Sequence, residues 1–220
     1  NAASTKEVVL NVVSYEIVEQ TSLSSTEYAE GVNEFVKAGL TPLKSDLVKP
    51  FRVKESPVQM ECIVKDIVSL GEEGGAGNLV ICEIVKMHIS KSILNTNQQI
   101  DPHKIDLVGR MGANWYCRAS GESIFEVQKP NTKIGIGYDQ LPTRIRNSFI
   151  LSGNDLAKLA NVEKIPSTED VEKFKENTDI AHILHTATDD EEAREELHYQ
   201  AKSLLENNQV KEAWKTLLID

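Results

Sequence analysis

The sequence predicts a mainly β domain followed by a C-terminal α-helical extension, and two observations lead to this class. Residues 1–150 contain several β-branched or alternating segments separated by turn residues, with few helical stretches between them. This pattern is typical of a β-barrel or sandwich rather than a parallel α/β sheet. Residues 151–220 instead carry apolar residues at helical spacing, and they hold 16 acidic but only 8 basic residues. Because charge and periodicity change together, we expect two domains, 1–150 and 151–220.

Three strands are expected in the first domain. Residues 8–13 are a β-branched run whose length favours a buried strand. Residues 58–64 alternate apolar and polar side chains, as in a half-buried strand. Residues 79–89 form a second long strand that becomes more polar near its end. The glycine-rich residues 71–78 would connect these two strands as a hairpin loop.

A short helix and a fourth strand complete the expected elements of this domain. Val32, Phe35 and Val36 have helical spacing, and Gly39 stands where a glycine commonly ends a helix. Residues 124–127 predict a short strand, which a proline ends three residues later.

The extension is expected to be helical throughout. Ser167 with Asp170 predicts a capping box at one helix start, and Thr188 with Glu191 predicts another. The last helix carries an apolar stripe at i, i+3, i+4, i+7 and i+8, formed by Val210, Ala213, Trp214, Leu217 and Leu218. A single helical hairpin cannot bury its own apolar face. We therefore expect it to dock on the β domain or on a second subunit.

Composition excludes several classes of protein. No apolar run approaches the roughly 20 residues of a membrane-spanning helix, and a net charge of -10 argues against a nucleic-acid surface. The three cysteines, Cys62, Cys82 and Cys117, are widely spaced, which fits buried thiols in a reducing compartment better than disulfides or a zinc site. With no recognisable signal peptide, these features predict a cytoplasmic protein with neither a membrane nor a nucleic-acid partner.

Common catalytic and binding motifs are missing. Residues 71–78 do not fit a phosphate loop, because they precede a strand and include two glutamates that would repel phosphate. Residues 135–137 lack the third glycine of a dinucleotide fingerprint, so any nicotinamide would bind transiently. His182 and His185 have no third ligand nearby, and no metal is expected. A nucleophile elbow of the G-x-S-x-G type is absent, which argues against acyl-transfer hydrolysis.

Residues 109–118 (GRMGANWYCR) are the most informative segment. They combine two glycines, two arginines, an amide and two large aromatic side chains. This mixture suits a flat, partly anionic ligand, since aromatic faces stack on a ring and guanidinium groups bind phosphate or carbonyl oxygens. The alternative is a turn and a strand whose aromatic side chains belong to the core. His88 has a similar pair of interpretations, facing a cleft or lying on the surface of its strand.

Four segments, in order along the chain, resemble those of a known family. Residues 31–41 (GVNEFVKAGLT) are similar to an EF-x-x-aGLT segment, and residues 53–62 (VKESPVQMEC) to an ESP-V-x-x-EC entry into a strand. Residues 77–89 match a long strand that ends in a histidine, and residues 105–116 match an R-x-G-G-x-x-Y turn. Over about residues 1–150, the chain thus resembles the flavin reductase-like, FMN-binding split-barrel family.

The resemblance implies a fold and an activity. The fold would be an FMN-binding split β-barrel of Greek-key topology with flanking α-helices, assembled as a homodimer with FMN in a groove at or near the dimer interface. The activity would be that of an NAD(P)H-dependent oxidoreductase, in which hydride passes from NADH or NADPH to N5 of the flavin. The cofactor supplies this chemistry, and the protein supplies binding and orientation.

The same resemblance implies the site residues. Arg110 would contact the pyrimidine edge of the flavin or its phosphate, with Gly112 in the same turn. Trp115 and Tyr116 would flank the ring. His88 would neighbour the nicotinamide and is the candidate catalytic residue.

The chain departs from the family pattern in two respects. The FMN-phosphate loops, a Pro-Arg-Pro segment and a following Ser/Thr strand, are expected upstream of residue 1. Asn1 would then be the last residue of the family's D-T-x-x-N motif and a further cofactor-binding residue. The helical extension is also outside the general pattern. Two alternative functions are therefore a non-enzymatic flavin-binding electron carrier and a flavin-free interaction scaffold that acts through the acidic extension.

Overall fold

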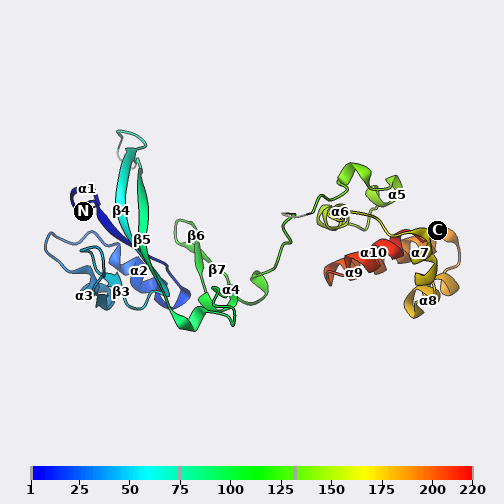
Figure 1. Ribbon diagram of the computed structural model, residues 1–220, viewed down its shortest axis with the longest axis horizontal. Helices are drawn as coiled ribbons and strands as arrows, with labels where there is room; N and C mark the ends of the chain where they lie inside the picture. The colour runs from blue at the N-terminus through cyan, green and yellow to red at the C-terminus, as the bar shows by residue number, and fades with distance from the viewer. Residues whose placement is uncertain (1, 74–75, 131–132, 220) are drawn as a thin grey trace. The chain divides into compact units, whose positions relative to one another are not determined.

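The computed structural model describes residues 2–73, 76–130 and 133–219. The chain divides into two compact units, Asn1–Glu126 and Val127–Asp220. Figure 1 shows the strands in the first unit, whereas the described residues of the second form helices and loops. No helix within the described ranges is long and apolar enough to cross a membrane.

The first unit is built around a three-stranded antiparallel sheet. Its strands are β1 (Glu7–Asn11), β4 (Val58–Ser69) and β5 (Asn78–Ile89), in the order β1-β4-β5 (Figure 1). These are the three strands that the sequence predicts. Gly74 and Gly75, in the segment that connects the two long strands, lie outside the described residues.

The other elements of the first unit are short. They are α1 (Ala2–Thr5), η1 (Tyr15–Ile17), α2 (Val18–Ser24), α3 (Glu34–Ala38), β2 (Pro42–Leu43), β3 (Arg52–Val53), η2 (Lys91–Ile93), α4 (Pro102–Ile105), β6 (Val108–Gly112), β7 (Trp115–Arg118) and η3 (Gly121–Ser123). The predicted glycine cap is confirmed, because Gly39 has a φ of 68° and donates its N–H to the carbonyl of Phe35 at the end of α3. Val32 precedes this helix, whose N-cap is Asn33.

The burial of β4 differs from the expected half-buried alternation. On one side, Val58 and Met60 pack with Ile93 and Ile105 in a small apolar cluster. On the other side, the polar Gln59 and Glu61 are also buried. The segment from β2 to β3 covers this side and offers hydrogen bonds to it, which allows polar side chains to be buried there.

The strands within the described residues form three separate sheets, β1-β4-β5, β2-β3 and β6-β7. Among them β5 pairs only with β4, so it is an edge strand and hydrogen bonds do not close the expected barrel. The prediction of a strand at residues 124–127 is wrong. These residues follow η3 without any helix or strand, because no neighbouring strand pairs with them, and Phe125 is 79% exposed.

The second unit contains a short 3₁₀ helix and six α-helices in its described part. They are η4 (Tyr138–Gln140), α5 (Thr143–Arg146), α6 (Gly153–Ala160), α7 (Thr168–Phe174), α8 (Thr178–Thr186), α9 (Asp190–Glu206) and α10 (Val210–Leu217). Ser167 caps α7 as predicted, with its side chain accepting the N–H of Asp170. The cap of α9 is Asp189 rather than Thr188, whose hydroxyl donates to Glu192.

The sequence predicts that the apolar stripe of α10 docks on the β domain or on a second subunit. This prediction is wrong, because the stripe is buried within its own unit. Trp214 is 1% exposed, and its indole N–H donates to the carbonyl of Leu159 in α6, at 3.0 Å. One core joins α5, α6, α9 and α10, and its buried members are Leu141, Ile145, Leu151, Leu156, Leu159, Ala201, Leu205, Ala213, Trp214 and Leu217.

The whole chain is mixed α/β rather than mainly β, with about 40% of residues in helices and 21% in strands. The short helices of the first unit and the helices before residue 151 account for the difference. The domain boundary expected at residue 150 stays a prediction about the family domain. In the packing of the chain, Leu141 and Ile145 belong to the core of the second unit.

The cysteines occupy three different environments. All three are free thiols, but only Cys62 is buried, while Cys82 is partly exposed and Cys117 is exposed. The expectation of three buried thiols is therefore wrong for Cys117, which lies on the exposed strand β7.

Candidate functional site

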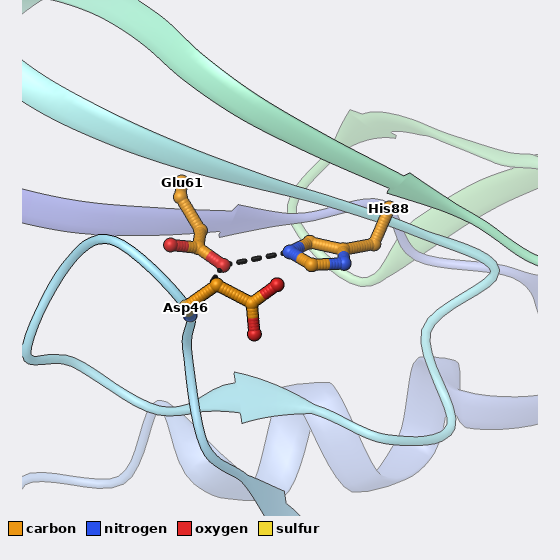
Figure 2. Close-up of side chains that lie close together, drawn as sticks. All are labelled: Asp46, Glu61 and His88. Atoms are coloured by element: carbon orange, nitrogen blue, oxygen red, sulfur yellow. Dashed lines mark hydrogen bonds and ion pairs between the residues drawn. The ribbon is translucent and has the colours of Figure 1, made fainter.

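His88 and Glu61 meet on one face of the sheet (Figure 2). In the register of β4 and β5, His88 lies opposite Gln59, and Glu61 lies opposite Lys86. Side chains two residues apart on a strand point to the same face, so Glu61 and His88 are diagonal neighbours. Nε2 of His88 lies 2.6 Å from Oε1 of Glu61.

The Glu61 carboxylate is fully buried and held by backbone donors. The segment between β2 and β3 turns three N–H groups toward it, from Asp46 at 2.9 Å, Leu47 at 2.6 Å and Val48 at 3.2 Å. Burial alone would raise the pKa of Glu61. The hydrogen bonds from these N–H groups and from His88 outweigh that effect and lower the pKa from 4.5 to about 2. Glu61 is therefore an anion at neutral pH.

Further charged side chains surround this pair. Lys86 forms an ion pair with Asp46, and its hydrogen bond lowers the pKa of the Asp46 carboxyl. Nε of Arg52 lies 3.9 Å from Oε1 of Glu61. The same guanidinium donates a hydrogen bond to the side-chain oxygen of Gln59 at 3.0 Å. The cluster thus combines two carboxylates with two fixed cations and an imidazole.

Asp46, Glu61 and His88 bring their potential ligand atoms within 4.8 Å of one another, close enough to invite a metal-site interpretation (Figure 2). The donor set argues against it. The oxygens of Glu61 already accept four hydrogen bonds, and the ammonium of Lys86 occupies the carboxylate of Asp46. A cation would have to displace these partners and approach two positive side chains.

Four of the predicted cofactor-binding residues lie on one hairpin, formed by β6 and β7. Arg110 and Gly112 belong to β6, and Trp115 and Tyr116 to β7. Gly112 has a φ of 105° in the turn, a value that favours glycine. Trp115 is 75% exposed and Tyr116 43% exposed, so the alternative that these aromatics are core residues of their unit is wrong.

The hairpin is fixed at its base and open at its tip. At the base, Arg118 donates to both carboxylate oxygens of Asp106 at 2.7 Å and stacks over the ring of Tyr15 at 3.8 Å. At the tip, the guanidinium of Arg110 donates to the carbonyl of Ala113 at 3.2 Å. The tip therefore offers a guanidinium and two aromatic faces to a ligand.

The structure gathers the predicted residues at two places. The four hairpin residues are together, whereas His88 belongs to the cluster with Glu61. Across the described part of the chain, no hydrogen bond or ion pair joins this cluster to the hairpin. Asn1, the remaining predicted residue, lies outside the described residues.

Sequence reasoning missed Glu61 and Asp46. Glu61 was taken as the polar side of an alternating strand, although a carboxylate between Met60 and Cys62 in an apolar strand was a signal that it needs donors. Asp46 contributes mainly through its backbone N–H, which carries no sequence signature.

A cleft of about 270 Å³ opens elsewhere in the first unit, near the start of β4 and the end of β5. It contains none of the predicted site residues. Its charges are mixed, and two of its carboxylates already have partners: Glu55 accepts the N–H of Thr41, and Asp106 binds Arg118. This lining favours no single class of ligand.

Comparisons with known proteins agree with the architecture. Residues 1–102 match the flavin reductase like domain family. An uncharacterised protein of Aquifex aeolicus (strain VF5) is 35% identical over 127 residues, or 58% of this chain and 63% of that protein. The chain thus spans less than two thirds of this relative.

Two solved structures share the fold. One is nitrilotriacetate monooxygenase component B from Bacillus cereus, with a TM-score of 0.52 and 24% identity over 58% of this chain and 62% of that one. The other is a split-barrel protein of the flavin reductase type from Shewanella frigidimarina NCIMB 400, with a TM-score of 0.50 and 25% identity over 59% of this chain and 63% of that one. Residues 1–102, which are somewhat less than half of the chain, therefore resemble the flavin reductase like domain in sequence and share the fold of these structures.

Proposed function

We propose that the protein is a flavin-dependent oxidoreductase that uses FMN and takes hydride from NADH or NADPH. The match of residues 1–102 to the flavin reductase like domain carries this proposal. The exposed aromatic hairpin adds to it, because an open tip with an arginine is suited to a flat ligand that bears carbonyl oxygens and a phosphate.

The hairpin residues fit the isoalloxazine ring of FMN. Trp115 and Tyr116 offer broad apolar faces that are open in this unit, and the Arg110 guanidinium has donors to spare after its one bond to Ala113. Gly112 keeps a side chain out of the turn. Bound FMN would supply the hydride acceptor, and these residues would bind and orient the ring. Asn1 would be a further cofactor-binding residue.

His88 would contact the nicotinamide. It lies near the end of β5 and its side chain is 19% exposed, while the carboxylate behind it is fully buried. The buried anion anchors one side of the imidazole, so the other side is left for a transiently bound ligand. No dinucleotide fingerprint is present in the chain, which agrees with transient binding.

The proposal includes a homodimer in the cytoplasm. Free thiols, one of them exposed, suit a reducing compartment. The edge strand β5 presents an apolar surface that a second copy would cover. Its exposed apolar side chains are Leu79, Val80, Ile81, Ile84, Val85, Met87 and Ile89.

The dimer has a direct test. A charge placed on β5 by Ile84→Lys should convert a dimer to a monomer in sedimentation, because a lysine would be buried unpaired at the interface. Leu23→Lys, on the exposed part of α2, is the matched control and should leave the assembly unchanged. A chain that sediments as a monomer without any substitution would refute the dimer.

The activity is tested by adding FMN and then NADH or NADPH to the purified protein. Binding of FMN is followed by the visible spectrum, and turnover by the loss of NADH absorbance. Arg110→Ala and Trp115→Ala should weaken FMN binding about tenfold or more each, on the scale of one lost charged hydrogen bond or stacking contact. Full FMN occupancy in both variants would refute the hairpin site.

The same assay separates the alternatives. A non-enzymatic electron carrier would bind FMN and show no NADH oxidation. A flavin-free scaffold would bind no FMN at all. Either result would replace the proposed activity.

A further inference from the structure

We propose that Glu61 is a positioning residue for His88, which fixes the ring proton on Nε2 and leaves Nδ1 as the ring atom that meets the ligand. The inference rests on the proposed function, in which His88 contacts a nicotinamide. Beyond that function, it assigns a role to Glu61 and a tautomer to His88.

The first step is that the Glu61 carboxylate has no free acceptor site. Oε1 accepts from the Asp46 N–H and from His88, and Oε2 accepts from the N–H groups of Leu47 and Val48. An ionised carboxylate has about four lone-pair positions in the plane of its oxygens, and all of them are occupied here. Glu61 therefore cannot bind substrate or accept a proton from it, and acts only through His88.

The second step concerns the proton between the two residues. The low pKa of Glu61, about 2, means that the carboxylate carries no proton of its own. A contact of 2.6 Å between Nε2 and Oε1 then requires the ring to be the donor. Nε2 therefore carries the hydrogen of the neutral ring, and Nδ1 carries none.

The third step is that Nδ1 is available. Figure 2 shows Nε2 turned toward Glu61 and the other ring nitrogen turned away from it. Within the part of the chain that the structure describes, His88 forms no hydrogen bond through Nδ1. The bare nitrogen of a neutral imidazole is an acceptor, and the amide N–H of a nicotinamide carboxamide is a donor that fits it. Glu61 thus prepares His88 to recognise this group.

The backbone reinforces this arrangement. Residues 46–48 are held over the sheet by Glu61, and the N–H of Lys49 also donates to Glu7 on β1, at 2.8 Å. The carboxylate cannot rotate away from His88 without breaking three backbone hydrogen bonds. The tautomer of the ring is therefore coupled to the position of this segment.

The wild-type protein gives the first test, without any flavin or nicotinamide. Nitrogen NMR of the full chain labelled at histidine, with His88 assigned by its loss in His88→Gln, reports which ring nitrogen carries the proton. We expect neutral His88 to be protonated at Nε2 and bare at Nδ1. The opposite tautomer, or an even mixture of both, would overturn the inference even if no variant folds.

The second test uses Glu61→Gln and a matched control. The amide can donate to Nε2, so a substantial fraction of His88 should move its proton to Nδ1, and the KM for NADH should rise about tenfold, as for a misplaced hydrogen bond. Asp46→Asn keeps the backbone N–H that binds Glu61 and changes only the nearby charge, so the wild-type tautomer should persist. A folded Glu61→Gln variant that keeps the wild-type tautomer contradicts the proposal.

These measurements also test the role of Glu61 separately from the proposed oxidoreductase activity. A merely structural Glu61 would alter the melting temperature on substitution but would not select the tautomer of His88. If the wild-type ring is protonated at Nε2 and shifts in Glu61→Gln, the positioning by Glu61 is established. If that same protein oxidises neither NADH nor NADPH in the presence of FMN, the proposed function fails separately.

Discussion

Glu61 is a charged side chain in a place where apolar side chains are usual. It is fully buried in a strand, between Met60 and Cys62. The energy of removing the carboxylate from water is offset because three backbone N–H groups and an imidazole replace the water around it. Among the described residues, these three N–H groups have no hydrogen-bond acceptor other than Glu61.

Glu61→Leu should destabilise the protein strongly. The substitution leaves the N–H groups of residues 46–48 without their carboxylate acceptor, and removal of one partner from a buried charged network costs about 3–5 kcal/mol. Urea denaturation followed by circular dichroism measures the free energy of unfolding. Glu83→Leu is the control, because Glu83 is exposed on β5 with Lys65 as its ion-pair partner, and its loss should cost less than about 1 kcal/mol. Equal losses in the two variants would contradict this account.

His198 should make the second unit sensitive to acid. Burial lowers the pKa of His198 below its usual 6.5, and the charges of Arg144 and Arg194 lower it further. Its Nδ1 lies 2.7 Å from the hydroxyl of Ser148. Because the unfolded chain binds the proton more readily, His198 contributes full stability above pH 6.5 and loses it as the pH falls below that value.

The measurement is the melting temperature of the full chain between about pH 7.5 and pH 5.5. The wild type should lose stability over this range, and His198→Gln should lose less. The exposed His185 on α8 provides the comparison, since His185→Gln should leave the wild-type pH dependence intact. Identical pH profiles for wild type and His198→Gln would show that His198 is not responsible.

The segment at 135–137 packs closely against a neighbouring helix. It lies against the end of α6, where Ile136 donates to the carbonyl of Val162 and Gly137 to that of Ala160. A Cβ on Gly135 would stand 2.6 Å from the carbonyl oxygen of Ala160. Backbone atoms cannot retreat as the end of a flexible side chain can, so this position admits only glycine without a shift of the chain.

Gly135→Ala should therefore lower the free energy of unfolding by about 1–3 kcal/mol, the usual range for overpacking. Gly153→Ala is the matched control. Gly153 lies in the first turn of α6, with open space around the position that a Cβ would take. Alanine also has a higher helix propensity than glycine. Chemical denaturation should show a loss for the first variant and a small gain or no change for the second. A harmless Gly135→Ala would show that α6 and residues 135–137 can move apart.

Elements whose patterns are local were predictable from the sequence. The long strands follow from β-branched and alternating runs, and the end of α3 follows from a single glycine. Failures came where a distant partner decides. Residues 124–127 look like a strand but have no strand to pair with, and the polar side of β4 is buried by a segment that begins with β2. The cap of α9 shifted by one residue because Asp189 competes with its neighbour.

The sequence also predicted part of the candidate site, namely the hairpin residues and His88, but not the role of Glu61. The hairpin residues are contiguous in sequence, so their composition alone marked them, and their exposure agrees with a binding role. His88 was marked by its place in a motif. Its dependence on Glu61 was not visible, because the contact joins residues 27 positions apart and the other donors are backbone N–H groups.

The whole chain is two bodies joined by residues without regular structure. Residues 124–130 contain no helix or strand, and their apolar side chains Phe125 and Val127 are 79% and 71% exposed. Each unit has its own apolar clusters, so neither core requires the other. Such connections are where proteases cut folded proteins first.

Brief trypsin digestion should accordingly cut the chain after Lys133, which is exposed three residues beyond this connection. Lys129 precedes Pro130 and is a poor trypsin site. Mass spectrometry should find two fragments that meet at this bond, and Lys133→Gln should delay their appearance. Early cleavage spread over both units would contradict the division into two independent bodies.

The two tryptophans of the chain lie one in each unit and in opposite surroundings. Trp214 is 1% exposed in the helical core, whereas Trp115 is 75% exposed on the hairpin. Their emission should differ in colour, with a blue-shifted component from Trp214 and a red-shifted component from Trp115 that acrylamide quenches. A flavin stacked on the hairpin would quench the red component. The protein thus contains its own fluorescent reporter for each unit, with no label added.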